Sequence, residues 1–261
     1  MRPAGPGYGI RFEGVSVRFG ATEALCDISV DVPGGSFRSV VGESGCGKTT
    51  LLRVAAGLQA CSGGSVTFVD DRGHRVMPRD GEIAVCFQEP RLLPWRSALA
   101  NVALPLELAG VPRRERLARA REMLAVTRLD VAERRLPAQL SGGMRMRVGL
   151  ARALVTQPRV LLLDEPCSAL DDFTREEMDD EIWRLYQATG ATCLLVTHGL
   201  AEAVRLSDAV IVLGGQPGRV HSVQPVALAH QQRADRSCDA FVDALSALMR
   251  EIARTRAGAV R

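Results

Sequence analysis

The order of apolar and polar residues predicts a strand, a loop and a helix in the first part of the chain. Residues 8–19 alternate in the manner of a β-strand, and residues 36–41 form a second short apolar run that ends in a glycine-rich loop. Residues 49–57 then change to helical periodicity, with Leu51, Leu52 and Val54 on one face before Gly57 ends the helix.

Helical periodicity dominates the middle of the chain. Residues 65–69 and 83–86 read as short strands, separated by a turn-rich insert. Residues 97–136 follow a helical pattern, and Leu117, Ala120 and Leu124 lie on one side of a charged helix. We expect residues 97–150 to form a helical subdomain.

Two later runs are apolar on both faces, which is typical of parallel strands buried between helices. Residues 160–163 end at Asp164, and residues 193–197 end at His198. Polar residues at the carboxyl ends of such strands lie where open α/β sheets bind ligands. After Leu213 the chain is predicted to be turn-rich and to end in an amphipathic helix, which carries Phe241, Val242, Leu245, Leu248 and Ile252.

Composition narrows the class of protein. The 261 residues suit one large α/β domain with appended lobes, and no run of eighteen apolar residues predicts a membrane-spanning helix. The N-terminus does not resemble a secretory signal, so we expect a cytoplasmic protein. The net charge is only +3, and the arginines of residues 113–121 alternate with Glu115 and Glu122, which favours a solvated helix face over a nucleic-acid surface.

Cysteine and lysine usage adds two points. The seven cysteines form no C-x-x-C pair, which favours reduced structural thiols over disulfides or zinc ligands. Of the 33 cationic side chains, Lys48 is the only lysine. Since an ammonium is a compact charge and a guanidinium a planar fork, the single lysine indicates that this position requires the ammonium.

The glycine-rich loop carries the first chemical motif. Residues 42–49 read Gly-Glu-Ser-Gly-Cys-Gly-Lys-Thr and match the phosphate-loop pattern G-x-x-x-x-G-K-[ST]. Its backbone N–H groups and the following helix N-terminus are suited to phosphate oxygens, with Lys48 on the β and γ phosphates and Thr49 on Mg²⁺. A purely structural glycine turn is the alternative, but the strand–loop–helix order favours phosphate binding.

Two further motifs identify a family. Residues 161–165 read Leu-Leu-Leu-Asp-Glu and resemble a Walker B strand, although solvated carboxylates also end ordinary strands. Upstream, residues 140–144 read Leu-Ser-Gly-Gly-Met; a serine helix cap would explain them in isolation. Because residues 140–144 lie upstream of the Walker B strand, they resemble the signature motif of ABC (ATP-binding cassette) ATPases.

The resemblance covers residues 8–215 and implies an α/β fold. A phosphate-loop NTPase core, with a mostly parallel sheet between helices, would carry an antiparallel β subdomain and an α-helical signature subdomain at about 97–150. Residues 216–261 would form a C-terminal extension. The implied cofactors are ATP and Mg²⁺.

The same resemblance assigns roles to individual residues. It implies Asp164 as a metal ligand, Glu165 as the residue that polarises water, and His198 as the switch histidine, which would otherwise be read as a packing or capping residue. Gln88 resembles the Q-loop glutamine, with catalytic and metal-binding roles, and residues 168–171 resemble the D-loop. Phe19 resembles the aromatic that stacks on adenine, which the resemblance favours over the alternative of a core residue at a strand end. The nucleotide-binding set is Phe19, Gly42, Glu43, Ser44, Gly45, Cys46, Gly47, Lys48, Thr49, Thr50, Ser141, Gly142 and Gly143.

The resemblance also implies partners. Two cassettes would pack head to tail, with ATP between Lys48 of one and Ser141 of the other. The helical subdomain would receive a coupling helix of separate transmembrane permease subunits, which work with a solute-binding protein at the inner membrane. Residues 92–95 could contribute apolar contacts there or belong to the subdomain core.

Local features narrow the branch. Residues 88–95, Met144 and residues 216–219 resemble the nitrate, sulfonate and taurine importers. A soluble ABC ATPase acting on nucleic acid or ribosomes is the alternative, but the chain lacks a second cassette and a strong basic footprint. A phosphate-loop kinase or GTPase is opposed by the signature motif. Gly199, Met146, Cys167 and Cys61 depart from the family pattern without removing a catalytic group.

Overall fold

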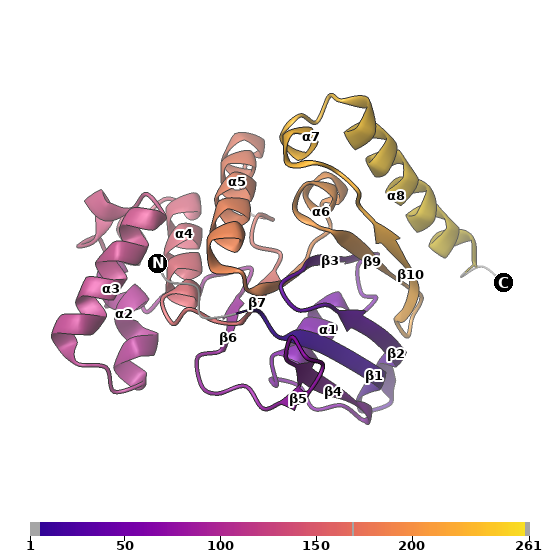
Figure 1. Ribbon diagram of the computed structural model, residues 1–261, viewed down its shortest axis with the longest axis horizontal. Helices are drawn as coiled ribbons and strands as arrows, with labels where there is room; N and C mark the ends of the chain where they lie inside the picture. The colour runs from indigo at the N-terminus through magenta and orange to yellow at the C-terminus, as the bar shows by residue number, and fades with distance from the viewer. Residues whose placement is uncertain (1–5, 169, 259–261) are drawn as a thin grey trace. The chain divides into compact units, whose positions relative to one another are not determined.

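The computed structural model describes residues 6–168 and 170–258, which form two compact units. One unit consists of residues 78–190, and the other combines residues 6–77 with residues 191–258 (Figure 1). Each unit is described by itself below. No helix among the described residues is long and apolar enough to span a membrane.

The split unit, residues 6–77 and 191–258, contains an antiparallel sheet and a mainly parallel one. The antiparallel sheet has the order β2-β1-β4-β5 and is formed by β1 (Gly9–Phe19), β2 (Thr22–Val32), β4 (Gly63–Val69) and β5 (Arg75–Val76). In the other sheet β3 (Phe37–Gly42) runs parallel to β8 (Thr192–Val196) on one side and to β9 (Ala209–Gly214) on the other. The antiparallel strand β10 (Arg219–Pro225) extends it beyond β9.

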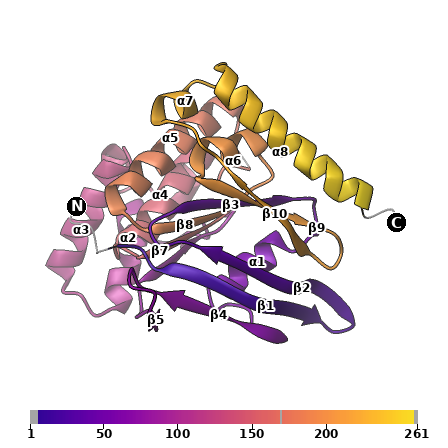
Figure 2. The same cartoon turned by 45° about the vertical axis from the view of Figure 1, so that its right-hand side comes forward.

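Helices cover this parallel sheet because its strands are apolar on both faces. Helix α1 (Lys48–Ala55) contacts β3, β8 and β2, while α6 (Leu200–Leu206) packs on β3 and β9. The C-terminal α7 (His230–Ala234) and α8 (Asp239–Gly258) follow, and α8 lies along β9 and β10 (Figure 2). Phe241 and Leu248 of α8 are buried in a cluster with Val41, Val204 and Val212.

The unit of residues 78–190 is mostly helical. Strand β6 (Ile83–Cys86) runs parallel to β7 (Val160–Asp164), every residue of which is buried. Helix α4 (Gly142–Leu154) packs on β6 and contacts three further helices. The remaining elements are α2 (Ala98–Leu108), α3 (Arg113–Val126), α5 (Asp172–Thr189) and the 3-10 turns η1 (Asp130–Ala132) and η2 (Pro137–Gln139).

Helix boundaries in this unit follow from their caps. The hydroxyl of Ser97 accepts from the N–H of Ala100 at the start of α2, and the carboxylate of Asp171 accepts from the N–H of Thr174 at the start of α5. Both satisfy one of the N–H groups that a helix start leaves without an intrahelical partner. Gly190, in the left-handed conformation, ends α5.

The structure confirms the predicted α/β fold and the strands and helices that were predicted, but strands β2 and β9 were not predicted, and one segment on the C-terminal side was predicted wrongly. The stretch after Leu213 was predicted to be turn-rich, but it contains β10, which pairs with β9 from Arg219 to Pro225. The polar residues of β10 hide its pattern because it is the last strand of its sheet, with alternate side chains exposed.

Candidate functional site

The phosphate loop connects β3 to α1 in a conformation that only glycines allow at two points. Gly42 has φ 155°, and a Cβ there would lie 2.4 Å from the carbonyl oxygen of Leu213. Gly47 has φ 90° at the N-cap of α1, and a Cβ would lie 2.5 Å from Leu25 Cδ2. A side chain at either position would therefore push the loop out of shape.

The ammonium of Lys48 lies inside this loop. Its Nζ donates hydrogen bonds to the carbonyl oxygens of Gly42 at 2.9 Å and Glu43 at 2.8 Å. Lys48 is buried, whereas the residues at the loop tip, Glu43, Ser44 and Gly45, are exposed. Thr49 and Thr50 follow in the first turn of α1, at the positive end of its dipole.

Cys46 turns away from the exposed tip of the loop. It is 1 % exposed, and burial raises the pKa of its thiol although Lys48 opposes this shift. At neutral pH it is therefore a neutral packing residue, and its contribution to a nucleotide would come from its backbone N–H.

His198 lies at the same edge of the sheet as the phosphate loop. Strands β3 and β8 are parallel neighbours with Val40 opposite Val196, so the loop after β3 and His198 after β8 leave the sheet at the same end. His198 is exposed. The backbone on either side is fixed, because the N–H of Gly199 donates to Thr197 Oγ1 at 2.8 Å and Thr197 bonds to Glu202.

Phe19 ends β1 in the same unit, opposite Thr22 of β2. Its side chain is 51 % exposed. The interpretation of Phe19 as a core residue is therefore wrong, because about half of the side chain is accessible.

The unit of residues 78–190 brings Gln88, Ser168 and Glu165 together. Gln88 Nε2 donates to Ser168 Oγ at 3.0 Å, and Ser168 Oγ donates to the carbonyl oxygen of Glu165, also at 3.0 Å. Because β6 and β7 are parallel, with Cys86 opposite Leu163, Gln88 and the Asp164–Glu165 pair follow their strands at the same end. Asp164 is buried.

Glu165 has an unusual backbone. Its φ is 47°, in the left-handed region that non-glycine residues rarely occupy. Such conformations cost free energy and persist where surrounding structure holds them, often at functional sites. The hydrogen bond from Ser168 to the Glu165 carbonyl is one such restraint.

The signature residues open helix α4. Ser141 is its N-cap, and Ser141 Oγ accepts from the N–H of Met144 at 3.2 Å, so the capping interpretation is confirmed. Capping uses only an acceptor lone pair, and the hydroxyl hydrogen can still serve a ligand. Ser141 and Gly142 are exposed, while a Cβ at Gly143 would lie 2.8 Å from Thr174 Cγ2.

The segment after Gln88 is fixed to the middle of α4. Arg152 donates to the carbonyl oxygen of Arg91 at 3.1 Å and also to that of Pro90. A Cβ at Gly149 would lie 2.6 Å from Pro90 Cβ, so the glycine permits the close approach. Burial lowers the pKa of Arg152, which stays charged at any physiological pH.

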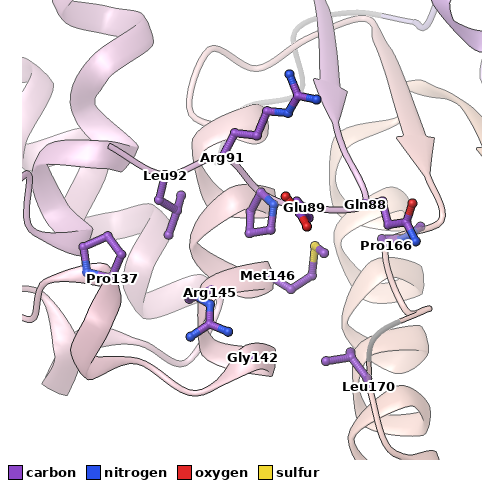
Figure 3. Close-up of a pocket in the computed structure, with 11 residues that line it drawn as sticks. Gln88, Glu89, Arg91, Leu92, Pro137, Gly142, Arg145, Met146, Pro166 and Leu170 are labelled. Carbon is purple, nitrogen blue, oxygen red and sulfur yellow. The ribbon is translucent and has the colours of Figure 1, made fainter. Parts of the chain in front are cut away.

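A cavity of about 350 Å³ lies between this segment and α4 (Figure 3). Met146 and Leu170 point toward its interior, while Glu89 and Arg145 supply charge. The residues around it are Gln88, Glu89, Pro90, Arg91, Leu92, Pro137, Gly142, Arg145, Met146, Pro166 and Leu170.

Sequence reasoning missed two residues of this region. Ser168 was noted only as part of the D-loop, and its bridge between Gln88 and Glu165 depends on two chain segments that the sequence does not show to be adjacent. Arg152 was not singled out at all, since one arginine among 32 gives no signal. The D-loop residue Ala169 lies outside the described residues.

A glycine loop between a strand and a helix, with one buried lysine, defines a phosphate-loop nucleoside triphosphatase. Residues 25–168 match the ABC transporter family. The chain therefore belongs to the ABC transporter family, and it is an ATPase of the ATP-binding cassette type.

Curated relatives match most of the chain. The aliphatic sulfonates import ATP-binding protein of Cupriavidus necator is 42 % identical over 97 % of this chain and 80 % of its own length. The taurine import ATP-binding protein of Pseudomonas putida is 43 % identical over 90 % of this chain and 91 % of its own. A solved dimeric ATP-binding cassette in a post-hydrolysis state, bound to ADP and Pi, matches with a TM-score of 0.70 at 30 % identity, over 84 % of this chain and 100 % of that one.

Proposed function

We propose that this chain is the ATP-hydrolysing subunit of an importer for a small sulfur-containing anion or zwitterion, such as an aliphatic sulfonate or taurine. The observation that carries this proposal is the similarity, over nine-tenths or more of the chain, to import ATP-binding proteins for these solutes. Residues 8–215 would be the ATPase domain and residues 216–261 an extension of it.

The phosphate loop would hold the ATP phosphates. In this structure Lys48 donates hydrogen bonds to two carbonyl oxygens of its own loop. When ATP binds, Lys48 would donate instead to oxygens of the β and γ phosphates. The loop N–H groups from Glu43 to Thr50 would bind the remaining oxygens, and the exposed ring of Phe19 would stack on adenine.

The donor set fits Mg²⁺. This ion prefers oxygen ligands and is usually held by one or two protein groups together with substrate phosphates. The hydroxyl of Thr49, the carboxylate of Asp164 and the amide oxygen of Gln88 are ligands of this kind. When bound, Mg²⁺ would neutralise charge on the β and γ phosphates.

The chemical step would rest on groups that surround the γ-phosphate. Glu165 would polarise the attacking water, and His198 would stabilise negative charge on the transferred group. Gln88 is linked through Ser168 to the backbone of Glu165, so a shift of Gln88 would move the residue that activates water.

The signature residues would serve a second copy of the chain. Ser141 and Gly142 are exposed at the positive end of helix α4, which is suited to an anion. In a head-to-tail homodimer, residues 141–143 of each copy would contact the ATP held by Lys48 of the other.

Transmembrane permease subunits would dock on the helical unit. Trp95 is 73 % exposed, so the interpretation of this side chain as core is wrong. Its loop is rigid, because the buried side chain of Asn101 bonds to both backbone groups of Leu93 and to the carbonyl of Arg96. The cavity beside Leu92 would receive the coupling segment of the permease at the cytoplasmic face of the membrane, with a solute-binding protein on the far side.

Growth on a sulfonate as sole sulfur source tests this function. Cells that lack the protein should fail to grow on taurine or an alkanesulfonate yet grow on sulfate, and the wild-type chain should restore growth. Lys48→Ala is the matched control, since it should fold and fail to restore growth. Normal sulfonate growth of the deletion strain would refute the proposed solute class.

A further inference from the structure

A second cavity lies in the split unit, between the C-terminal helix α8 and strand β10. Its volume is about 330 Å³. It is lined by Gly214, Gly215, Arg219, Val220, His221, Arg254 and Thr255. Neither the phosphate loop nor any residue with a proposed role in hydrolysis takes part.

The charge of this cavity is positive. Among the described residues, none of those that line it is acidic. The carboxylate of Glu251 lies beside it, 3.3 Å from His221 Nε2 and 2.9 Å from Arg254 NH1. Two guanidinium groups and one carboxylate leave a net charge of +1 with neutral His221 and +2 with protonated His221.

Arg219 is available to a ligand. Its NH2 group donates to Cys26 Sγ at 2.8 Å, and sulfur is a weak acceptor. A guanidinium presents five donors in a planar fork, which matches the oxygens of phosphate, sulfate or sulfonate groups. The two guanidinium groups and the imidazole form a set of donors for an oxyanion, which would share Arg254 and His221 with the carboxylate of Glu251.

The turn that leads into this cavity also packs on the phosphate loop. A Cβ at Gly218 would lie 2.0 Å from the carbonyl oxygen of Cys46, and a Cβ at Gly45 would lie 3.0 Å from Gln216 Nε2. The N–H of Gly218 donates to the carbonyl of Ala24 at 3.0 Å, which fixes the turn on β2. Residues 214–219 therefore touch the cavity at their two ends and the phosphate loop at their centre.

We propose that the cavity between α8 and β10 is a regulatory site for a small oxyanion, whose binding changes nucleotide affinity through residues 214–219. The site takes a phosphate, sulfate or sulfonate group, and it is independent of which solute the permease carries. In this proposal, residues 216–219 link the cavity to the phosphate loop, and the C-terminal extension helps to form the regulatory site.

Calorimetric titration of the full chain tests the binding. A saturating, non-hydrolysable Mg-ATP analogue keeps oxyanions out of the phosphate loop, including its γ-phosphate position, and sodium chloride holds ionic strength constant during titration with sulfate, phosphate or taurine. We expect one saturable site per chain, weakened about tenfold or more by Arg219→Gln and by Arg254→Gln, because each removes one guanidinium fork. Arg250→Gln, an exposed position on the same helix, is the matched control and should bind like wild type.

The probes distinguish the source of the anion. If sulfate or phosphate binds and taurine does not, the ligand of the site is an inorganic oxyanion. If taurine binds preferentially, the ligand is an organic sulfonate. The proposed site is refuted if none of the three binds, or if Arg219→Gln and Arg254→Gln, with unchanged thermal unfolding midpoints, bind as tightly as wild type.

The link to the phosphate loop has its own measurement. Sulfate competes with a fluorescent ATP analogue at the loop in every variant, so the comparison is between wild type and Arg219→Gln. Sulfate should change the apparent Kd of the analogue in both proteins. We expect the size of that change to differ by about threefold or more between wild type and Arg219→Gln. Identical responses would refute the coupling through residues 214–219.

Discussion

Position 48 requires a particular kind of cation, an ammonium, and not only a positive charge. Its ammonium fits between two carbonyl oxygens inside a loop whose glycines leave no spare room. Everywhere else in the chain a cation is arginine. The physical difference is shape, since a guanidinium is broad and planar.

Lys48→Arg should therefore fail although it keeps the charge. The planar guanidinium cannot enter the phosphate loop without displacing the loop backbone, so the phosphate oxygens lose the donor that Lys48 provides. We expect kcat for ATP hydrolysis to fall by about a hundredfold or more, the usual effect of losing one aligned donor to a developing charge. Steady-state phosphate release measures this, with circular dichroism as the check that the protein folds. Wild-type turnover would show that the lone lysine is incidental.

The cysteines behave as the sequence predicts, with no disulfide among them. Cys86 and Cys193 are fully buried, and burial raises the pKa of Cys86 to about 12 and that of Cys193 well above its ordinary value. Since only the thiolate reacts, a raised pKa leaves almost none of it at pH 8.

Thiol labelling should follow this order. With iodoacetamide at pH 8, we expect Cys26 and Cys238, which are partly exposed, to react in the folded protein. Cys86 and Cys193 should react only after unfolding in guanidinium. Peptide mass spectrometry of the labelled chain gives the rates, and labelling of Cys86 as fast as Cys238 would contradict the burial seen here.

Residue roles could be predicted where one chain segment carries the whole motif. The phosphate loop, the acidic pair and the signature serine were each found from the sequence. Arg152 and Ser168 could not be found, because each acts through a partner about 60 to 80 positions away in the chain. Long-range hydrogen bonds leave no periodic pattern for a sequence to display.

At the scale of elements, α4 is the helix on which the Q-loop segment rests. The signature residues form its first turn, and Arg152 and Gly149, on its later turns, hold residues 90 and 91. A displacement of the Q-loop segment would therefore be transmitted to the signature turn through one rigid helix.

Arg152→Met should destabilise the protein while keeping the packing of the side-chain stem. Two carbonyl oxygens lose a charged donor, so we expect a loss of about 2 kcal/mol in the free energy of unfolding. Arg152→Lys, which can reach one carbonyl, should fall between. Urea denaturation measures the effect. Arg121→Met, which breaks only the exposed ion pair with Glu133, is the control and should cost about 0.5 kcal/mol or less.

Elements buried on both faces were predicted best, and the edge strand β10 was missed. Strands β7 and β8 are continuous apolar runs because every residue is buried. In β10, exposed positions alternate with half-buried ones, and several of its residues are polar. Two glycines and a proline lie just before its start. Its pairing depends on β9, which local composition does not reveal.

At the scale of the whole molecule, the proposed head-to-tail pairing would complete the catalytic site. Glu165→Gln keeps the size of the side chain and removes the carboxylate that activates water. Hydrolysis should fall by about a hundredfold or more, while Lys48 and Asp164 still hold the nucleotide. We expect this variant to form a long-lived dimer with Mg-ATP but not with Mg-ADP, measured by size-exclusion chromatography with light scattering.

A second substitution tests the orientation of that dimer. Ser141→Arg in the Glu165→Gln background should abolish dimerisation, because it places bulk at the partner's phosphate site. Loss of the helix cap alone costs about 1 kcal/mol. Ser97→Arg removes the equivalent cap of α2 and is the control that should still dimerise. Persistent dimers with Ser141→Arg would exclude the head-to-tail arrangement.

The exposed Trp95 has an optical consequence. The chain contains two tryptophans, and the other, Trp183, packs against Tyr186 on α5 with ring centroids 5.5 Å apart. An indole in water emits at longer wavelength than one in an apolar contact, and Trp95 stands on the rigid loop where the permease is proposed to dock. Intrinsic fluorescence should therefore shift to the blue as the complex assembles, and Trp95→Phe would silence that shift without a dye or tag on either partner.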